Sequence, residues 1–165
     1  MPSLTITFAT PADIPAIIDI HNATWNNTYN TILSQDQIEY MSKKFYSEAA
    51  LATSMNEEGH QFLILCSDGS PSGFASFSEL KPAYFKLHKL YVLPTCQGTG
   101  AGKCLITAVE NYVKEKGALK ICLNVNRYNN ARHFYEKMAY RIVREEDIPV
   151  GPYWMNDFVL EKALL

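Results

Sequence analysis

Three glycines at alternate positions, in the run Gln97-Gly98-Thr99-Gly100-Ala101-Gly102, are the residues whose types and spacing point most directly to chemistry. The run lies between a strand-like segment, 87–93, and a helix-like segment, 103–116. The glycines leave a strand-to-helix turn without side chains and allow backbone angles that other residues resist. The free N–H groups that begin the following helix, together with its dipole, form a receptor for phosphate. We therefore expect a ligand that carries phosphate groups.

The spacing excludes two familiar phosphate-binding loops. A P-loop has a glycine five residues before its Gly-Lys pair and a serine or threonine after it, but these positions hold Gln97 and Cys104. A dinucleotide fingerprint, Gly-x-Gly-x-x-Gly, that begins at Gly98 ends on Lys103. The later strand-like segment, 119–125, also offers no acidic residue for a ribose. The phosphate ligand therefore belongs to another class.

The run does match the pattern Gln-x-x-Gly-x-Gly, and related segments flank it. It resembles the pyrophosphate loop of the GNAT superfamily of acetyl-CoA-dependent N-acetyltransferases. Segment 90–94, Leu-Tyr-Val-Leu-Pro, resembles the family's central strand, and segment 123–137, with its Asn and Phe-Tyr helix, resembles the next family motif. The resemblance covers residues 73 to about 143 in the family's order. One departure is Ala139-Tyr140 in place of Gly-Phe, from which we expect a helix end without a left-handed residue.

The resemblance implies a donor site for acetyl-CoA. Main-chain N–H groups from Gly98 to Gly102 are expected to hold the pyrophosphate, and the backbones of Leu90 and Val92 to bind the pantetheine. Asn129 matches a family asparagine that hydrogen-bonds the pantetheine, but asparagine is also a preferred helix N-cap, and both roles stay open. The donor-site residues expected on this resemblance are Leu90, Tyr91, Val92, Gln97, Gly98, Thr99, Gly100, Ala101, Gly102, Lys103, Asn124, Asn129 and Arg132.

Tyr135 is the candidate general acid. It matches the family tyrosine that lies near the thioester sulfur, and a phenol with a pKa near about 10 suits protonation of an alkyl thiolate. The alternative is a core aromatic residue, because Ala131, Phe134 and Met138 share its helical face. The family match favours the role of acid.

The general base is open. Many relatives carry a Glu on the strand before the glycine loop, but segment 84–90 here has no acidic residue. His88 shares a strand face with Leu90 and Val92 by a two-residue period, and its intrinsic pKa suits deprotonation of an ammonium. Glu79, at the end of the previous strand, is the other candidate. Two further possibilities are equally open: His88 has no catalytic role, or a chain of water molecules carries the proton away from the amine.

Aromatic residues in two regions are candidates for the acceptor site. Trp25 and Tyr29 on the first helix, with Tyr153 and Trp154 before the last strand, offer faces that can hold a cation. Glu145, Glu146, Asp147 and Asp157 surround the second pair. Each aromatic by itself is more typical of a core, but a pair in a loop often carries function.

Segment 151–162 resembles the bacterial spermidine/spermine acetyltransferase branch of the family. The resemblance implies acetyl transfer from acetyl-CoA, by direct attack, to a primary amine of a small molecule, with a polyamine as one acceptor class. Two alternatives remain: a protein or peptide N-acetyltransferase, and an acetyl-CoA-binding regulatory module without turnover. A homodimer is common among proteins of this kind, although no interface can be read from the sequence.

Bulk properties narrow the class of protein. The 165 residues are 47% hydrophobic and 19% charged, which is typical of one globular domain, 1–165. No apolar stretch reaches the roughly 20 residues of a membrane helix, and no signal peptide is apparent. With a net charge of −2 and no basic cluster, nucleic acid is not an expected partner. Cysteines 66, 96, 104 and 122 lack metal-ligand spacing, so we expect reduced thiols, no metal and a cytoplasmic location.

Hydrophobic periodicity predicts one α+β domain with a mixed central sheet. The resemblance implies the GNAT-type fold, in which this sheet is mostly antiparallel and flanked by helices. Leu105, Ile106, Val109 and Val113 repeat at helical spacing after the glycine loop. The expected strands are 4–8, 61–66, 73–78, 84–93, 119–125, 141–146 and 155–160. We expect a first helix that begins at Pro11 and three further helices at 34–55, 103–116 and 130–138.

Overall fold

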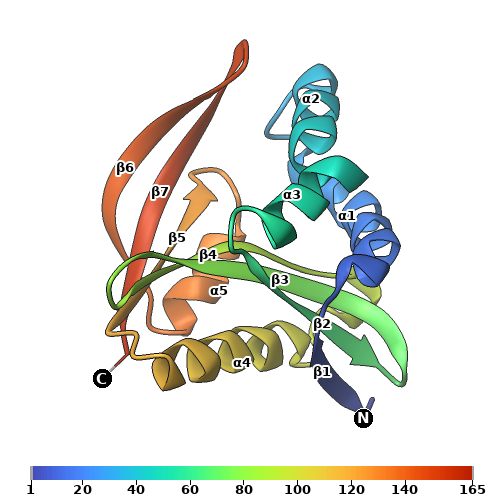
Figure 1. Ribbon diagram of the computed structural model, residues 1–165. Helices are drawn as coiled ribbons and strands as arrows, with labels where there is room; N and C mark the ends of the chain where they lie inside the picture. Colours follow the sequence, from blue (N-terminus) through green and yellow to red (C-terminus); the bar gives the residue numbers. More distant parts are fainter. Residues whose placement is uncertain (1, 165) are drawn as a thin grey trace.

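Seven strands form one sheet in the order β1-β2-β3-β4-β5-β7-β6 in the computed structural model, which describes residues 2–164 (Figure 1). The strands are β1 Leu4–Phe8, β2 Gln61–Ser67, β3 Ser70–Lys81, β4 Tyr84–Val92, β5 Lys120–Asn126, β6 Arg141–Val150 and β7 Tyr153–Ala163. The pair β4–β5 is parallel and the other neighbouring pairs are antiparallel. This confirms the predicted mixed, mostly antiparallel sheet.

Helices cover both faces of the sheet (Figure 1). The five α-helices are α1 Ile14–Tyr29, α2 Gln35–Tyr46, α3 Glu48–Asn56, α4 Ala101–Glu115 and α5 Ala131–Lys137. Two short 3₁₀ turns, Pro11–Asp13 and Pro94–Cys96, precede α1 and the glycine loop. Helices α4 and α5 share one hydrophobic core with the sheet, and α1, α2 and α3 share a second core on the opposite face.

The helix α4 follows directly from its amphipathic pattern. Leu105, Ile106, Val109 and Val113 are completely buried against the sheet, as their spacing predicts. The helix connects β4 to β5, so these two strands run parallel. Gly117, just after the end of α4, has a φ of +91°, the left-handed conformation that commonly terminates a helix.

Three expectations about local structure are wrong. The predicted helix 34–55 is two helices, because Ser47 adopts an extended backbone and its side chain caps α3 through the N–H of Ala50. The last two strands are longer than predicted and meet at a tight turn at Gly151, so Tyr153 and Trp154 lie in β7 and not in a loop. Ala139 has a φ of +72°, so the end of α5 does use a left-handed residue.

Strand β4 parts from β5 halfway along its length. The two pair only between Tyr84–Leu87 and Lys120–Leu123. At the same point β4 slips against β3, where Ser76 pairs with Lys89 and Phe77 with Leu87, so His88 is an extra residue in a β-bulge. Beyond this bulge the edge of β4 that faces β5 is unpaired. A cleft opens there, at the carboxyl ends of two parallel strands.

Candidate active site

The cleft between β4 and β5 has a volume of about 830 Å³ and is bordered by the starts of α4 and α5. Most of the predicted donor-site residues line it: Leu90, Tyr91, Val92, Gln97, Gly98, Gly100, Ala101, Gly102, Lys103, Asn124 and Asn129. The structure therefore brings the predicted residues, which come from two strands and two helix starts, together in one cleft. Thr99 and Arg132 are not among the lining residues.

The glycine loop presents a row of free N–H groups. Gly98 and Gly100 have φ values of +79° and +85°, which glycine adopts without strain. Together with Ala101, Gly102 and Lys103, they donate no backbone hydrogen bond to any acceptor within residues 2–164. These N–H groups lie at the N-terminus of α4, where the helix dipole adds positive potential. The arrangement is the one that a pyrophosphate requires.

Tyr135 lies in α5 with 8% of its surface exposed and borders the same cleft. Burial raises the pKa of its phenol well above the usual value, and the neighbouring Tyr29 raises it further. The phenol therefore keeps its proton at neutral pH and can act as a hydrogen-bond donor or an acid. It also packs with Phe134 and Tyr140. The position of Tyr135 is therefore compatible with both predicted roles, general acid and core aromatic residue.

Some of the predicted donor-site residues have side-chain partners within the protein. The Oδ1 of Asn129 accepts a hydrogen bond of 2.9 Å from the N–H of Ala131, at the start of α5. Arg132 forms an ion pair of 3.2 Å with Glu136 and lies over the ring of Phe158. The Thr99 hydroxyl donates to the carbonyl of Cys96 and holds the loop closed on itself.

A second cavity, of about 710 Å³, lies on the other side of β4, between the helices α1–α3 and the β5–β7 strands. Trp25 and Tyr29 line it, and each is 5% exposed. Tyr153 and Trp154 do not: Tyr153 packs against Tyr40, and Trp154 is 56% exposed on the hairpin. The structure therefore brings together only the first of the two predicted aromatic pairs.

The two cavities adjoin. They share five lining residues, which are Tyr29, His88, Lys89, Tyr91 and Asn124. A ligand with its phosphates on the glycine loop would thus have its far end next to the second cavity. Two substrates can occupy the two cavities at once and meet at this junction.

His88 stands at the junction and Glu79 does not. The Nε2 of His88 lies 2.7 Å from the Ser78 hydroxyl, and its ring stacks on His60 with centroids 4.0 Å apart. Burial, with the positive charge of His60, Lys86 and Lys89, lowers the pKa of His88 to about 3. Glu79 is exposed at the β3–β4 turn, where its carboxylate accepts from the N–H of Ala83, and it lines neither cavity.

The bulge overturns the strand-face argument for His88. A regular period of two places residues 88, 90 and 92 together, but the extra residue shifts the phase. Leu87, Leu90 and Val92 pack on the α4 side, while Tyr91 packs on the α1 side. Lys89 then lines the second cavity beside Tyr46 and Phe62, with its Nζ 5.1 Å and 6.0 Å from their ring centroids.

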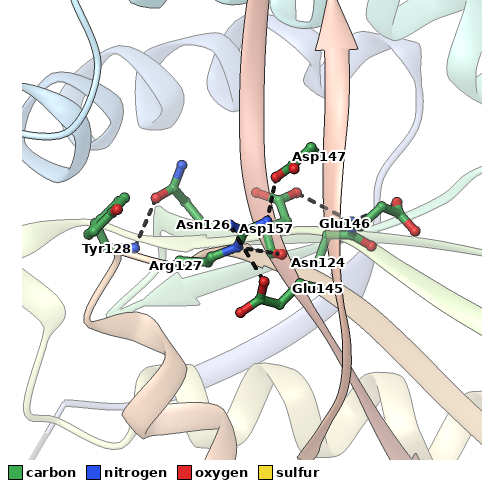
Figure 2. A network of polar contacts seen from close by, with 8 residues as sticks. All are labelled: Asn124, Asn126, Arg127, Tyr128, Glu145, Glu146, Asp147 and Asp157. Atoms are coloured by element: carbon green, nitrogen blue, oxygen red, sulfur yellow. Dashed lines mark hydrogen bonds and ion pairs between the residues drawn. The ribbon is translucent and has the colours of Figure 1, made fainter.

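Sequence reasoning missed Lys89 and His60, and it placed Asp157 only among the acidic residues around Tyr153 and Trp154. Lys89 forms no ion pair within residues 2–164, and burial lowers its pKa to about 8. Asp157 is 5% exposed and lines the second cavity, within the polar network of Figure 2. Its alternation with Met155 and Val159, both buried, was the available signal that it faces inward.

The described residues show neither a metal site nor a membrane span. No three His, Cys, Asp or Glu side chains within residues 2–164 are grouped so as to hold a metal ion. Over the same residues, no helix is both long enough and apolar enough to cross a bilayer.

Comparison with known proteins assigns the family. A family model described as an acetyltransferase (GNAT) domain matches residues 30–151. The chain is 31% identical over 120 residues to an uncharacterized N-acetyltransferase from Mycobacterium bovis, which covers 72% of this chain and 77% of that one. It is 27% identical over 154 residues, 91% of each chain, to the spermidine N(1)-acetyltransferase of Thermoplasma acidophilum.

A solved structure agrees over almost the whole chain. The PaiA N-acetyltransferase from Thermoplasma acidophilum, crystallised in complex with coenzyme A, superposes with a TM-score of 0.83 at 28% identity. The match covers 98% of this chain and 99% of that one. With the sheet, the cleft and the glycine loop described above, these matches show that the chain belongs to the GNAT family of acetyltransferases.

Proposed function

We propose that the protein transfers the acetyl group of acetyl-CoA to a primary amine of a small molecule, by direct attack of the amine on the thioester. The observation that carries the proposal is the pair of adjoining cavities, one bordered by free N–H groups and the other by aromatic and charged side chains. Holding two reactants in contact is most of what this reaction requires, since the thioester is already activated.

The first cavity is the proposed donor site. The free N–H groups of the glycine loop and the first turn of α4 hold the pyrophosphate, and the free edge of β4 at Leu90 and Val92 holds the pantetheine. A nearby N–H of the same edge polarises the thioester carbonyl. Tyr135 gives its proton to the departing thiolate of CoA, a role that its protonated, buried phenol supports.

The second cavity is the proposed acceptor site. Trp25 and Tyr29 offer ring faces to a cation, and Asp157 and Glu58 are the carboxylates that line the cavity. A polyamine is the acceptor class that we propose first, because the similar protein from Thermoplasma acidophilum is a spermidine N(1)-acetyltransferase. Lys44, Lys86 and Lys89 line the same cavity, so amines that also bear a carboxylate belong in the comparison.

The experiment is release of CoA thiol from acetyl-CoA in the presence of single amines, with the acetylated product identified by mass spectrometry. The panel contains spermidine, spermine, putrescine, amino acids, aminoglycosides and short peptides. Turnover of one class of small amine supports the proposal. Turnover that depends on peptide sequence would identify a protein N-acetyltransferase instead. Binding of acetyl-CoA without turnover of any amine would identify a regulatory module.

A further inference from the structure

Asp157 places a carboxylate in the wall of the acceptor cavity. It lies in β7 opposite Asn126 of β5 and Glu146 of β6, so it comes from a strand that is paired on both sides, one strand in from the edge of the sheet. Its Oδ2 accepts a hydrogen bond of 3.3 Å from the side-chain amide of Asn124. Asn124 in turn borders both cavities. The carboxylate is therefore held one residue away from the junction where donor and acceptor meet.

The other oxygen of this carboxylate is unused. The Oδ1 of Asp157 is buried and has no hydrogen-bond partner within residues 2–164. A buried carboxylate oxygen without a partner is costly, because it loses its water and gains nothing in return. An ammonium group of a bound acceptor would supply the missing donor.

The nearest arginine does not neutralise the carboxylate. Figure 2 shows Arg127 beside Asp157, but its Nε donates to the backbone carbonyl of Asp157 at 3.2 Å. The rest of its guanidinium pairs with Asp147 and, at 3.7 Å, with Glu145. Among the described residues, the side chain of Asp157 therefore has Asn124 as its hydrogen-bond partner and forms no ion pair.

We propose that Asp157 is the general base of the acetyl transfer: its Oδ1 receives the acceptor's ammonium group and takes one proton from it. This inference rests on the proposed function. The freed lone pair of the amine attacks the thioester carbonyl carbon, so a C–N bond forms. The C–S bond then breaks, and the sulfur takes a proton from Tyr135. The amide nitrogen loses its surplus proton to solvent, from which Tyr135 is reprotonated, and Asp157 releases its own proton to solvent.

The surroundings of Asp157 suit this task. Burial raises the pKa of its carboxyl, and Glu146 on β6 raises it further, while Asn124 on β5, Lys86 on β4 and Arg127 after β5 act in the opposite direction. Tyr29 of α1 lines the same cavity. A carboxylate with a raised pKa is a stronger base than one in water. His88, by contrast, has its Nε2 next to Ser78 and a pKa lowered to about 3.

The test is the Asp157→Asn substitution, which keeps the shape of the side chain and its contact with Asn124. With an amine that the wild-type protein acetylates, we expect kcat/KM near neutral pH to fall by about 100-fold or more. The loss should shrink as pH rises, because more of the amine arrives already neutral. For the same reason, acceptor amines of low pKa should lose less than amines of high pKa. The dissociation constant of acetyl-CoA should not change.

Asp147→Asn is the matched control, since this carboxylate belongs to the same network (Figure 2) but lines neither cavity. A loss of equal size at every pH and for every amine, or an equal loss in both variants, would mean that Asp157 is only structural and would overturn the inference. If the wild-type protein itself acetylates no amine, it is the proposed function that fails. The two failures are therefore distinguishable.

Discussion

The Ser78 hydroxyl lies 2.7 Å from the Nε2 of His88, at the residue where β4 bulges out of register with β3. The contact stabilises the extra residue of the bulge on the neighbouring strand. The bulge separates β4 from β5 and shifts the phase of the side chains that follow. The donor cleft and the position of Lys89 in the acceptor cavity are both consequences of it.

Lys89→Met should improve binding of a cationic acceptor. The ammonium of Lys89 has no ion-pair partner among the described residues and lies in the acceptor cavity. Removing this like charge should lower KM for spermidine by about 3- to 10-fold, the scale of a screened repulsion between two charges several ångströms apart. Steady-state kinetics with Lys44→Met, at the exposed rim, is the control and should show a smaller change. A raised KM, confined to amines that bear a carboxylate, would show instead that Lys89 holds an anionic group of the acceptor.

Tyr135→Phe should separate chemistry from binding. The variant keeps the packing of the ring but removes the proton donor, so kcat should fall by roughly 100-fold, the usual scale of an acid's contribution. The dissociation constant of acetyl-CoA, measured by calorimetry, should stay as in the wild type. Tyr112→Phe, on α4 and packed against Phe77, is the matched control. Equal kcat for Tyr135→Phe and the wild type would leave Tyr135 as a core residue only.

His21 should make the fold sensitive to acid. Its ring is 2% exposed, stacks on Tyr46 and lies 2.9 Å from the Ser42 hydroxyl, and burial lowers its pKa to about 4. Above pH 6.5 the ring is neutral in both states. As pH falls below 6.5, His21 becomes protonated in the unfolded chain but stays neutral in the folded protein. The free energy of unfolding therefore decreases progressively down to about pH 4.

Between pH 6.5 and 5 this one residue should lower the free energy of unfolding by about 2 kcal/mol. Urea titrations at several pH values measure it. His60 and His88 also have lowered pKa values, so the useful quantity is the difference between the wild type and His21→Phe. The variant should have the flatter pH dependence. Parallel curves for the two proteins would rule out His21 as the source.

Ala139→Gly should stabilise the protein. The φ of +72° at the end of α5 is strained for alanine and easy for glycine. After the greater chain entropy of glycine in the unfolded state is deducted, we expect a gain of about 0.5–1 kcal/mol. Ala52→Gly, inside α3, is the control and should cost about 1 kcal/mol. A loss of stability in both variants would contradict this explanation.

The sequence predicted what depends on local pattern. The glycine loop, the buried face of α4 and the strands β2 and β3 follow from residue spacing, and the structure has each of them. The donor-site residues mostly follow too, because they belong to the loop and to segments next to it in the chain. A strand-to-helix turn and the helix behind it need no distant partner to be recognised.

The acceptor side depends on contacts that no local pattern encodes. The bulge at His88 comes from pairing with β3, and it changes which side of β4 Lys89 occupies. Asp157 is buried because β7 lies between β5 and β6, which the chain order does not reveal. The length of the β6–β7 hairpin likewise removed Tyr153 and Trp154 from the expected pocket.

The most direct test of the account is an initial-rate study in which acetyl-CoA and the acceptor amine are varied together. Two adjoining cavities predict that both substrates are bound before transfer, so double-reciprocal plots should give lines that intersect. Parallel lines would mean that the acetyl group first moves to the enzyme and that CoA leaves before the amine reacts. That result would contradict direct transfer at the junction of the two cavities.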